Sequence, residues 1–394
     1  MLKEKNIEKE KKMMVVAFYL PQFYSFPEND KWWGEDFTEW TNVKKSKPLW
    51  NGHYQPTIPL NNNFYRLDSI EPMKEQVRLA RKYGVDGFCF YHYWFGKNRQ
   101  LMEKPVENYL KEPSLDLPFC LCWANHNWSR TWVGGDKDVL MDMNYGDEEE
   151  WGKHFNYLIK FFKDDRYIKI DNKPVLVIYL PQDIPKFDKW RKFMNQMAEN
   201  NDLNGICFIG QAYIVGKENE FEGLDYFIEY EPNYTRYLFQ CRLKNNVLKN
   251  LKESKKFTFD IFKYILKNKI KRFTRGKLCK VNTINYDAEW EAIINRIPTN
   301  RKMLAGAFVK CDVTPRRQDR ALIYKGDTPE KFEKYLKSLF MKIKESYSKN
   351  ILFVSAWNEW GEGMYLEPDE KNKYGYLEAL QKAKEVCIDK HNIH

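Results

Sequence analysis

The stretch ILFVSAWNEWGEGMYLEP, residues 351–368, begins with a strand-forming run that is followed by two acidic residues. Its first residues are apolar and β-prone without a polar alternation, which is typical of a strand buried on both faces of a parallel sheet. The run stops at Glu359 and Glu362, which lie among Trp357, Trp360 and glycines. We therefore expect a strand that delivers two carboxylates to one edge of a parallel sheet.

Seven further runs of this kind occur along the chain, and helical patterns usually separate them. The eight expected strands are 14–20, 85–94, 118–125, 174–180, 205–212, 225–231, 304–313 and 351–358. The expected helices are 69–83, 149–163, 187–199, 287–296, 329–346 and 374–388. This alternation predicts an α/β fold, the (β/α)8 TIM barrel. A doubly wound open sheet is the alternative, but no GxGxxG or GxxxxGK[ST] stretch follows a strand.

Two long segments interrupt the alternation. Residues 21–66 form a loop after the first strand, and a loop of this length is usually functional or disordered. Its many aromatic residues argue against disorder. The second segment, about 235–285, holds fourteen Lys or Arg against two acids between residues 242 and 280. Because we find no repeat and no low-complexity linker, we predict one domain, 1–394, with a long first βα loop and a basic insertion after strand six.

The charge and hydropathy of the sequence indicate where the protein is located and which partners it binds. The net charge is +10, but most of the excess lies in the basic insertion, so the rest of the chain is close to balanced. The N-terminus has no signal-peptide pattern, and no apolar segment reaches the roughly 20 residues that span a bilayer. The cysteines lie mostly in apolar runs, as buried free thiols do in a reducing compartment. We expect a cytoplasmic protein that does not bind nucleic acid.

Catalytic groups of a TIM barrel lie where the strands end, at the C-terminal face. The residues there, with those of the first loop, are aromatic, amide-bearing and acidic, a set that suits sugar hydroxyls and ring faces. We expect no metal and no cofactor, because His92, His126 and Asp312 lack HxH or HExxH spacing. The predicted glycan-binding residues are Tyr19, Gln22, Trp40, His92, Trp94, Trp123, Asn125, His126, Trp128, Tyr179, Gln211, Glu229, Glu231, Trp357 and Asn358.

Glu359 and Glu362 are the predicted catalytic residues. Cleavage of a glycosidic bond needs one acid for the leaving oxygen and a second carboxylate as nucleophile or base. Neighbouring like charges would raise the pKa of one carboxyl, which suits a general acid near neutral pH. An acidic pair on the surface is the alternative, but the buried strand before the pair and the two tryptophans beside it favour catalysis.

Three motifs, FYLPQFYSFPENDKWWGEDFTEWTNV, CWANHNWSRTW and AWNEWGEGMYLEPD, closely resemble the WbsX-like family of bacterial surface-polysaccharide loci, over residues 16 to 379. That family is related to glycoside hydrolase family 99, the endo-α-mannosidases and endo-α-mannanases. The resemblance implies a (β/α)8 barrel in which Glu359 acts as base on a sugar 2-hydroxyl and Glu362 as general acid and then base. The chain departs from the related patterns at Tyr24, His126 and Gly361, where His, Glu and His are usual.

Three functions follow from these observations. The first is a retaining glycoside hydrolase acting on a bacterial surface glycan such as O-antigen or capsule. The second is a glycosyltransferase or transglycosylase of O-antigen or lipopolysaccharide biosynthesis, and the third is a non-catalytic glycan-binding protein. The expected partner is an oligo- or polysaccharide, including a lipid-linked one. Residues 255–277 alternate lysines with apolar residues at roughly helical spacing, so a peripheral contact with the inner face of a membrane is a further hypothesis.

Overall fold

The computed structural model describes residues 13–130, 135–213, 218, 221–236 and 281–389. Eight strands pair in parallel in chain order, and β1 pairs with both β2 and β14, so the sheet closes on itself. The protein is therefore a (β/α)8 barrel, as predicted, and all eight expected strands are confirmed. These strands are β1 (Met14–Tyr19), β2 (Gly87–Gly96), β4 (Phe119–Trp123), β8 (Lys173–Ile178), β9 (Cys207–Ala212), β10 (Tyr226–Glu229), β12 (Met303–Phe308) and β14 (Ile351–Ser355).

Six helices surround the barrel at the positions that the apolar periodicity predicts. Two of them begin at residues that suit a helix N-terminus: the Asp147 side chain accepts from two backbone N–H groups of α5, and Thr328 caps α11 before Pro329. The helices are α3 (Glu71–Lys82), α5 (Glu148–Phe162), α6 (Phe187–Glu199), α9 (Tyr286–Asn295), α11 (Pro329–Ser346) and α12 (Gly375–Asp389).

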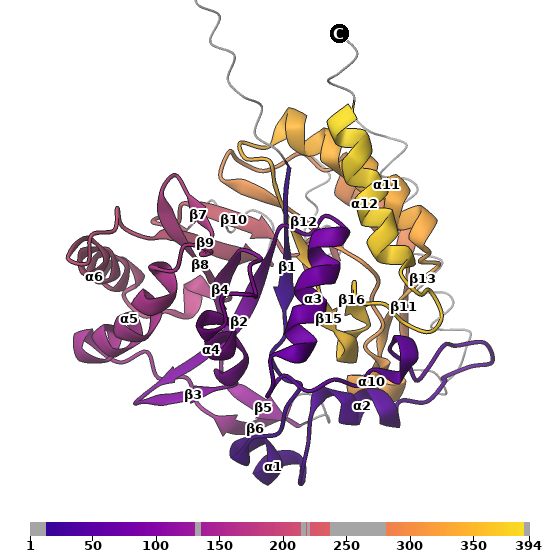
Figure 1. Cartoon of the computed structure of the whole chain (residues 1–394), viewed down its shortest axis with the longest axis horizontal. Helices are drawn as coiled ribbons and strands as arrows, with labels where there is room; N and C mark the ends of the chain where they lie inside the picture. Colours follow the sequence, from indigo (N-terminus) through magenta and orange to yellow (C-terminus); the bar gives the residue numbers. More distant parts are fainter. Residues whose placement is uncertain (1–12, 131–134, 214–217, 219–220, 237–280, 390–394) are drawn as a thin grey trace, which may run out of the picture.

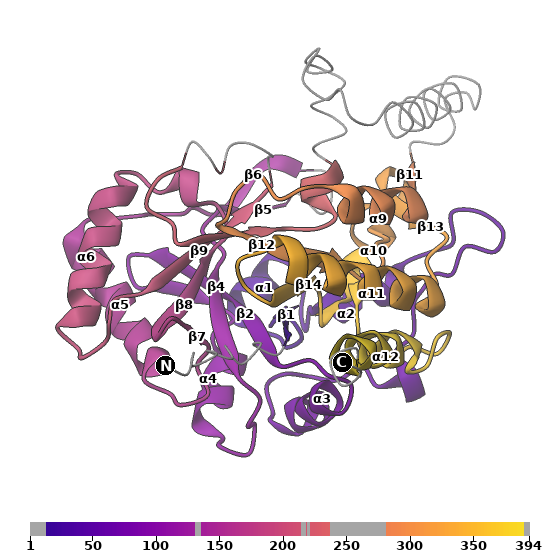
Figure 2. The same cartoon turned by 90° about the horizontal axis from the view of Figure 1, so that it is seen from above.

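The helices form groups on the outside of the barrel. Helices α5 and α6 lie side by side on one flank, and α11 packs against both α9 and α12 on the other (Figures 1 and 2). Each helix buries an apolar face, such as Phe332, Leu336 and Phe340 of α11. Among the described residues, no helix is long and apolar enough to cross a membrane.

The connections carry further short elements that the sequence pattern did not predict. The loop after β1 is ordered, with two helices and a 3-10 turn. The basic insertion lies mostly outside the described residues. The additional elements are α1 (Pro27–Trp33), α2 (Glu39–Lys45), η1 (Leu60–Asn62), β3 (Arg99–Leu101), α4 (Lys104–Lys111), β5 (Trp128–Arg130), β6 (Gly135–Met141), β7 (Lys169–Ile170), η3 (Pro181–Asp183), β11 (Asn282–Asn285), α10 (Thr314–Arg317), η7 (Gln318–Arg320), β13 (Leu322–Lys325), β15 (Asn358–Glu359), η8 (Trp360–Glu362) and β16 (Met364–Tyr365).

Aromatic side chains fill the inside of the barrel. The ring of Phe18 packs on Tyr91, Tyr230 and Phe353, with centroids 5.4–5.7 Å apart. Because alternate residues of a strand point to opposite faces, the residues next to these point outward into the helix layer. This alternation decides which of the residues at the strand ends reach the barrel axis.

Candidate active site

The two acids follow β14 in a tight hairpin. Glu359 ends β15, which pairs antiparallel with β16, and Glu362 ends the η8 turn between them. Gly363 closes that turn at φ +63, and a Cβ there would lie 2.8 Å from the backbone nitrogen of Asp312. The hairpin therefore holds both carboxylates beyond the carboxyl end of β14, at the C-terminal face of the barrel.

One guanidinium joins three carboxylates at this place. Arg316, on α10, donates from Nε to Glu39 Oε1 at 2.8 Å and from Nη2 to Glu359 Oε2 at 3.0 Å. Its Nη1 donates to Glu362. Glu39 lies on α2 in the first loop, so the loops after β1, β12 and β14 all meet at Arg316.

The two acids differ in burial. The Glu359 side chain is 8% exposed, and that of Glu362 is 31% exposed. Burial raises the pKa of Glu359 to about 8, the Arg316 charge opposes this rise, and the negative charges of Glu362 and Glu39 add to it. Burial therefore disfavours the ionised form of Glu359, whereas Glu362 is reachable from solvent.

Tyrosines line the barrel axis beneath the acids. The hydroxyl groups of Tyr91 and Tyr230 lie 3.0 Å apart. Burial raises the pKa of Tyr91, Tyr93 and Tyr230, and the negative charge of Glu359 contributes to each rise. Tyr179 also lies within the field of the acids, and burial raises its pKa to about 12. The acids therefore lie near a group of neutral tyrosine side chains, whose hydroxyl groups can donate hydrogen bonds to an oxygen-rich ligand.

Some predicted glycan-binding residues join this group. The His126 ring stacks on Tyr179 with centroids 4.9 Å apart, and Trp128 meets the Tyr93 ring edge-on at 5.3 Å. Gln211 accepts from the Tyr213 hydroxyl, and that ring packs on Tyr179. Tyr179, Gln211, His126 and Trp128 are thus the predicted binding residues that the fold gathers around Glu359 and Glu362.

His126 differs from the others in its hydrogen bonding. Burial lowers its pKa to about 4, so the ring is neutral. Its Nδ1 is buried, and within the described residues it has no hydrogen-bond partner.

Three predicted binding residues face the helices instead. His92 Nε2 lies 3.0 Å from His154 Nε2 of α5, and the Trp94 ring stacks on His154 at 4.9 Å. Trp123 donates from Nε1 to the Trp94 carbonyl at 2.9 Å. Each is at most 8% exposed, so these side chains form core packing between the barrel and α5.

Two predicted residues, both asparagines, hold strand ends together. Asn358 binds both backbone groups of Leu20, accepting from N at 2.7 Å and donating to O at 3.0 Å. Asn125 binds Leu180 in the same way, at 2.8 and 2.7 Å. Both are fully buried and position the loops around the site rather than facing the acids.

Four more predicted residues, at or after the ends of β1 and β14, are buried in contacts with other protein groups. Tyr19 donates to Gln76 of α3 at 2.6 Å, and Trp357 packs on Phe88 at 5.1 Å. Trp40 donates from Nε1 to the Tyr65 carbonyl at 2.8 Å, and Gln22 donates to Asn29 at 3.3 Å.

The last two predicted binding residues, Glu229 and Glu231, are also bound by protein groups. Arg296, which follows α9, pairs with Glu231 at 2.9 Å and with Glu229. Tyr347 donates to Glu229 at 2.8 Å. Both acids are at most 1% exposed, so they belong to an ion-pair cluster outside the barrel.

The residue pattern missed Arg316, Glu39 and the axial tyrosines Tyr91 and Tyr213. Arg316 follows β12 by eight residues on a short helix, and no periodic signal marks such a turn. The tyrosines carry a signal: Tyr91 and Tyr93 alternate with His92 and Trp94, so one of the two sets must face the axis. Within the described ranges, no group of three His, Cys, Asp or Glu side chains could hold a metal ion.

Comparisons with known proteins identify the family and the fold of the chain. The model of the family described as "Glycosyltransferase WbsX" matches residues 15–380. Proteins named "Uncharacterized protein WxcX" from two strains of Xanthomonas campestris pv. campestris are each 32% identical over 381 residues. These matches cover 94% of this chain and 49% of each relative, so the chain spans about half the length of the curated relatives.

Solved structures of the same fold include the GH99 endo-alpha-mannosidase from Bacteroides thetaiotaomicron. It is 14% identical, with a TM-score of 0.51, over 96% of this chain and 97% of that chain. A protein described as "Glycoside hydrolase-like protein" is 15% identical, with a TM-score of 0.52, over 95% and 94% of the two chains. At these identities the likeness establishes the barrel fold.

Proposed function

The chain belongs to the WbsX glycosyltransferase family, and from this premise we propose that it is a retaining glycoside hydrolase acting on a bacterial surface glycan such as O-antigen or capsule. Glu359 and Glu362 are the proposed catalytic residues. The observation that carries the proposal is the convergence of both carboxylates on Arg316 at the C-terminal face of the barrel. Two carboxylates held by one guanidinium lie close together, as the short spacing of a retaining pair requires, about 5–5.5 Å.

The proposed first step forms a 1,2-anhydro sugar. Glu359 removes the proton of the sugar 2-hydroxyl, and O2 attacks C1. The bond from C1 to the glycosidic oxygen breaks, and Glu362 gives its proton to that oxygen. The deep position of Glu359 suits contact with the sugar ring, and the exposure of Glu362 suits contact with the leaving group.

The proposed second step reverses these proton transfers. Glu362 takes a proton from water, and the water oxygen attacks C1. The C1–O2 bond breaks, and Glu359 returns its proton to O2. Because each step inverts C1, the product retains its configuration.

The proposed mechanism requires Glu359 to be ionised when the first step begins. Three carboxylates surround one guanidinium, so a proton on Glu359 reduces the surplus negative charge in the free protein. In the first step the one proton of the pair has to lie on Glu362, because Glu359 acts as base and Glu362 gives its proton to the leaving oxygen. Arg316 favours the ionised form because it donates to the Glu359 carboxylate.

A glycosyltransferase or transglycosylase is the second candidate, and the family description favours it. The first step would be the same, and a sugar hydroxyl would replace water in the second. A non-catalytic glycan-binding protein is the third candidate. The neutral tyrosines near the acids are compatible with all three candidate functions, so the reaction products decide among these functions.

Product analysis tests the proposal. A panel of α-linked oligosaccharides is incubated with the protein and with the Glu359→Gln and Glu362→Gln variants, and products are followed by NMR. We expect a free reducing sugar of retained configuration, and a loss of turnover by a factor of at least about 10² in each variant. The exposed Glu378→Gln on α12 is the matched control and should turn over normally. A new glycosidic linkage would instead indicate transfer, and unchanged turnover in both variants would end the assignment.

We extend the proposal to a lipid-linked glycan at the inner face of the membrane. Residues 255–277, which carry the basic amphipathic pattern, lie outside the described residues, so the pattern itself is the support. The full chain should sediment with liposomes that contain anionic lipid and should be released by salt. Failure to sediment at low salt would remove the membrane contact and leave the catalytic proposal intact. The expected cytoplasmic location stays a prediction.

A further inference from the structure

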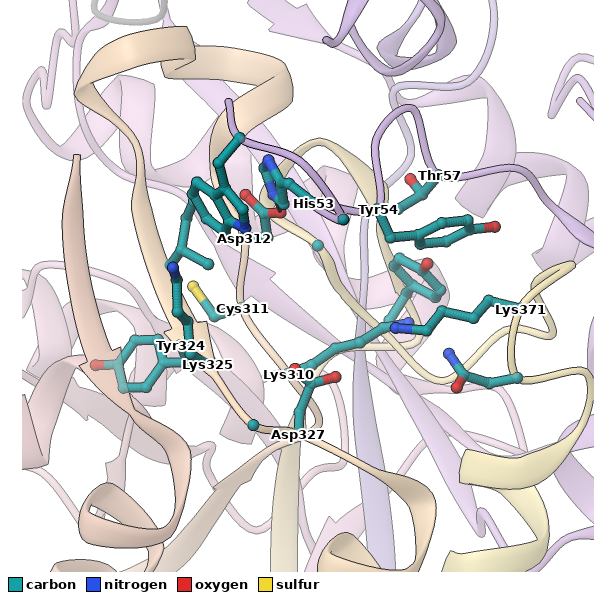
Figure 3. A pocket seen from close by; sticks show the side chains of 17 residues that line it. His53, Tyr54, Thr57, Lys310, Cys311, Asp312, Tyr324, Lys325, Asp327 and Lys371 are labelled. Atoms are coloured by element: carbon teal, nitrogen blue, oxygen red, sulfur yellow. Dashed lines mark hydrogen bonds and ion pairs between the residues drawn. The ribbon is translucent and has the colours of Figure 1, made fainter. Parts of the chain in front are cut away.

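A cavity adjoins the hairpin that carries the acid pair. Its volume is about 270 Å³, and it lies between the first loop, the end of β12, β13 and the segment after the acids (Figure 3). This size is at the lower end of small-molecule sites, about 300–1,000 Å³, so it suits one sugar residue or a phosphate group. Neither acid of the catalytic pair lines it.

The cavity shares a wall with the catalytic hairpin. Gly363, the residue after Glu362, lines it, as does Asp312. The backbone nitrogen of Asp312 donates to the Glu362 carbonyl at 2.8 Å. A group held in the cavity would therefore lie beside the acids, within the reach of a glycan that occupies both places.

Three lysines bring positive charge to the cavity. Lys310 Nζ lies 3.7 Å from the Tyr365 ring centroid, Lys325 Nζ lies 3.5 Å from that of Trp50, and Lys371 Nζ lies 5.3 Å from that of Tyr54. Figure 3 shows Lys310 and Lys371 reaching toward each other from opposite sides. The rings fix the amines over apolar surfaces, which are also the surfaces on which a sugar ring can lie.

The carboxylates near these lysines are already bound by protein donors. Asp312 Oδ2 accepts from Gln55 at 2.8 Å and lies 2.7 Å from His53 Nε2. Asp369 accepts from Lys310 and from the Tyr365 hydroxyl, both at 2.8 Å. Asp327 accepts from the Tyr376 hydroxyl at 2.7 Å. Lys310 is paired with Asp369, Asp327 is half-buried, and Lys325 and Lys371 are exposed.

We propose that this cavity is a subsite for a negatively charged group of the glycan, the carboxylate of an acidic sugar or a phosphate, bound by Lys325 and Lys371 beside aromatic rings. The subsite deepens the proposed function, on which its catalytic relevance rests, by naming an anionic glycan as the substrate class. Binding at the cavity itself does not require turnover.

Binding of small anions tests the subsite directly. Sodium glucuronate, inorganic phosphate and glucose are titrated by calorimetry at low ionic strength into the full-length protein and into the Lys325→Gln/Lys371→Gln double variant. We expect saturable binding of glucuronate, of phosphate or of both, at least about tenfold weaker in the double variant. Binding of glucuronate alone would support an acidic sugar, and binding of phosphate alone would support a phosphorylated or phosphate-linked glycan.

A matched control separates the cavity from general charge. Lys44 is also an exposed lysine over an aromatic ring, 4.2 Å from the centroid of Phe64, and it does not line the cavity. Lys44→Gln removes one positive charge of the same kind, and this variant should bind the anions as the unchanged protein does. An equal loss of affinity in Lys44→Gln and in the double variant would overturn the assignment to the cavity.

Two results would overturn the subsite: no saturable binding of either anion, or glucose binding as tightly as glucuronate with no effect of the double variant. The same titration into Glu359→Gln keeps this test apart from the catalytic one. Normal anion binding by that inactive variant supports the subsite as a separate structure. If Glu359→Gln and Glu362→Gln retain turnover, the proposed function fails, and the anion titration still decides the cavity.

Discussion

The Arg316 guanidinium contacts Glu39, Glu359 and Glu362 at once, and its side chain is 5% exposed. Its planar fork suits this task, because each edge can address a different carboxylate. Removal of one member of a buried charge cluster usually lowers the folding stability by more than the intact cluster adds to it, because the remaining charges stay unpaired. Arg316 is therefore a positioning residue for the acid pair in the proposed mechanism.

Arg316→Lys should retain the charge and lose the fork. We expect turnover to fall by about tenfold or more, because an ammonium point charge cannot orient both acids. Arg316→Met should in addition lose about 3–5 kcal/mol of stability, because Glu39 would remain buried without its partner. Turnover by NMR and chemical unfolding measure the two effects. Equal turnover in the protein and in Arg316→Lys would exclude the positioning role.

The raised pKa of Glu359 predicts the pH dependence of the proposed reaction. The first step needs one proton on the acid pair, and the pair loses that proton as pH rises through about 8, so kcat/KM should fall about tenfold per pH unit above about 8. Arg316→Gln should move this limb to higher pH, because the positive charge that favours the ionised form is lost. A rate that instead keeps rising through pH 8 would contradict general-acid catalysis by this pair.

The alternation of strand residues explains most errors in the predicted binding set. At the end of β2, the sequence offers Tyr91 and Tyr93 or His92 and Trp94, and both pairs suit a sugar. The structure turns the tyrosines to the axis and His92 toward His154. Composition cannot decide which set points inward, because only pairing with neighbouring strands fixes that face. The proposed catalytic acids escape this ambiguity because they follow the strand, in its loop.

At the scale of elements, helix α2 and the η8 turn meet at a point that only glycine allows. A Cβ on Gly361 would lie 1.5 Å from Glu39 Oε1 and 2.8 Å from Arg316 Nε. The Glu39 side chain therefore lies directly against the backbone of the hairpin that carries the two acids. Glu39 reaches Arg316 across the place where a side chain at 361 would stand.

Gly361→Ala should displace Glu39 from Arg316 and lower both stability and turnover. We expect about 1–3 kcal/mol of destabilisation from the added methyl group. Gly152→Ala on α5 is the control, because a Cβ there meets nothing closer than 3.9 Å. Unfolding in denaturant and the NMR assay give the two readouts. Normal behaviour of Gly361→Ala would mean that the hairpin can move away from α2.

The regular elements were predictable and the short ones were not. All eight barrel strands and the six flanking helices follow from apolar periodicity, because each buries a long continuous face. Elements such as α10 and β15 have four residues or fewer, and tertiary contacts stabilise them. The active-site geometry lies mainly in such elements, so its position was predictable but the partners of the acids were not.

At the scale of the whole molecule, closure of the barrel joins the two ends of the described chain. Strand β1 pairs with β14 through Met14 to Ala17, and with β2 through Val16 to Tyr19. Loss of either pairing would open the sheet and expose strands that are buried on both faces. The barrel is therefore expected to be one cooperative unit.

Unfolding should show a single transition. Urea titrations followed by tryptophan fluorescence and by far-ultraviolet circular dichroism should coincide, because Trp40, Trp190 and Trp290 report on different sectors of one core. Separated transitions would divide the chain into independently stable parts and contradict the single domain predicted for residues 1–394.

The junction at Arg316 also sets the order in which the protein can mature on the ribosome. Glu39 emerges early during synthesis, Arg316 emerges after nearly 280 further residues, and the acids follow later still. A nascent chain can form its first strands and helices, but it cannot assemble the charge cluster until the last strand has left the exit tunnel. Until then Glu39 has no cation to meet, and the growing polypeptide cannot carry out the proposed reaction.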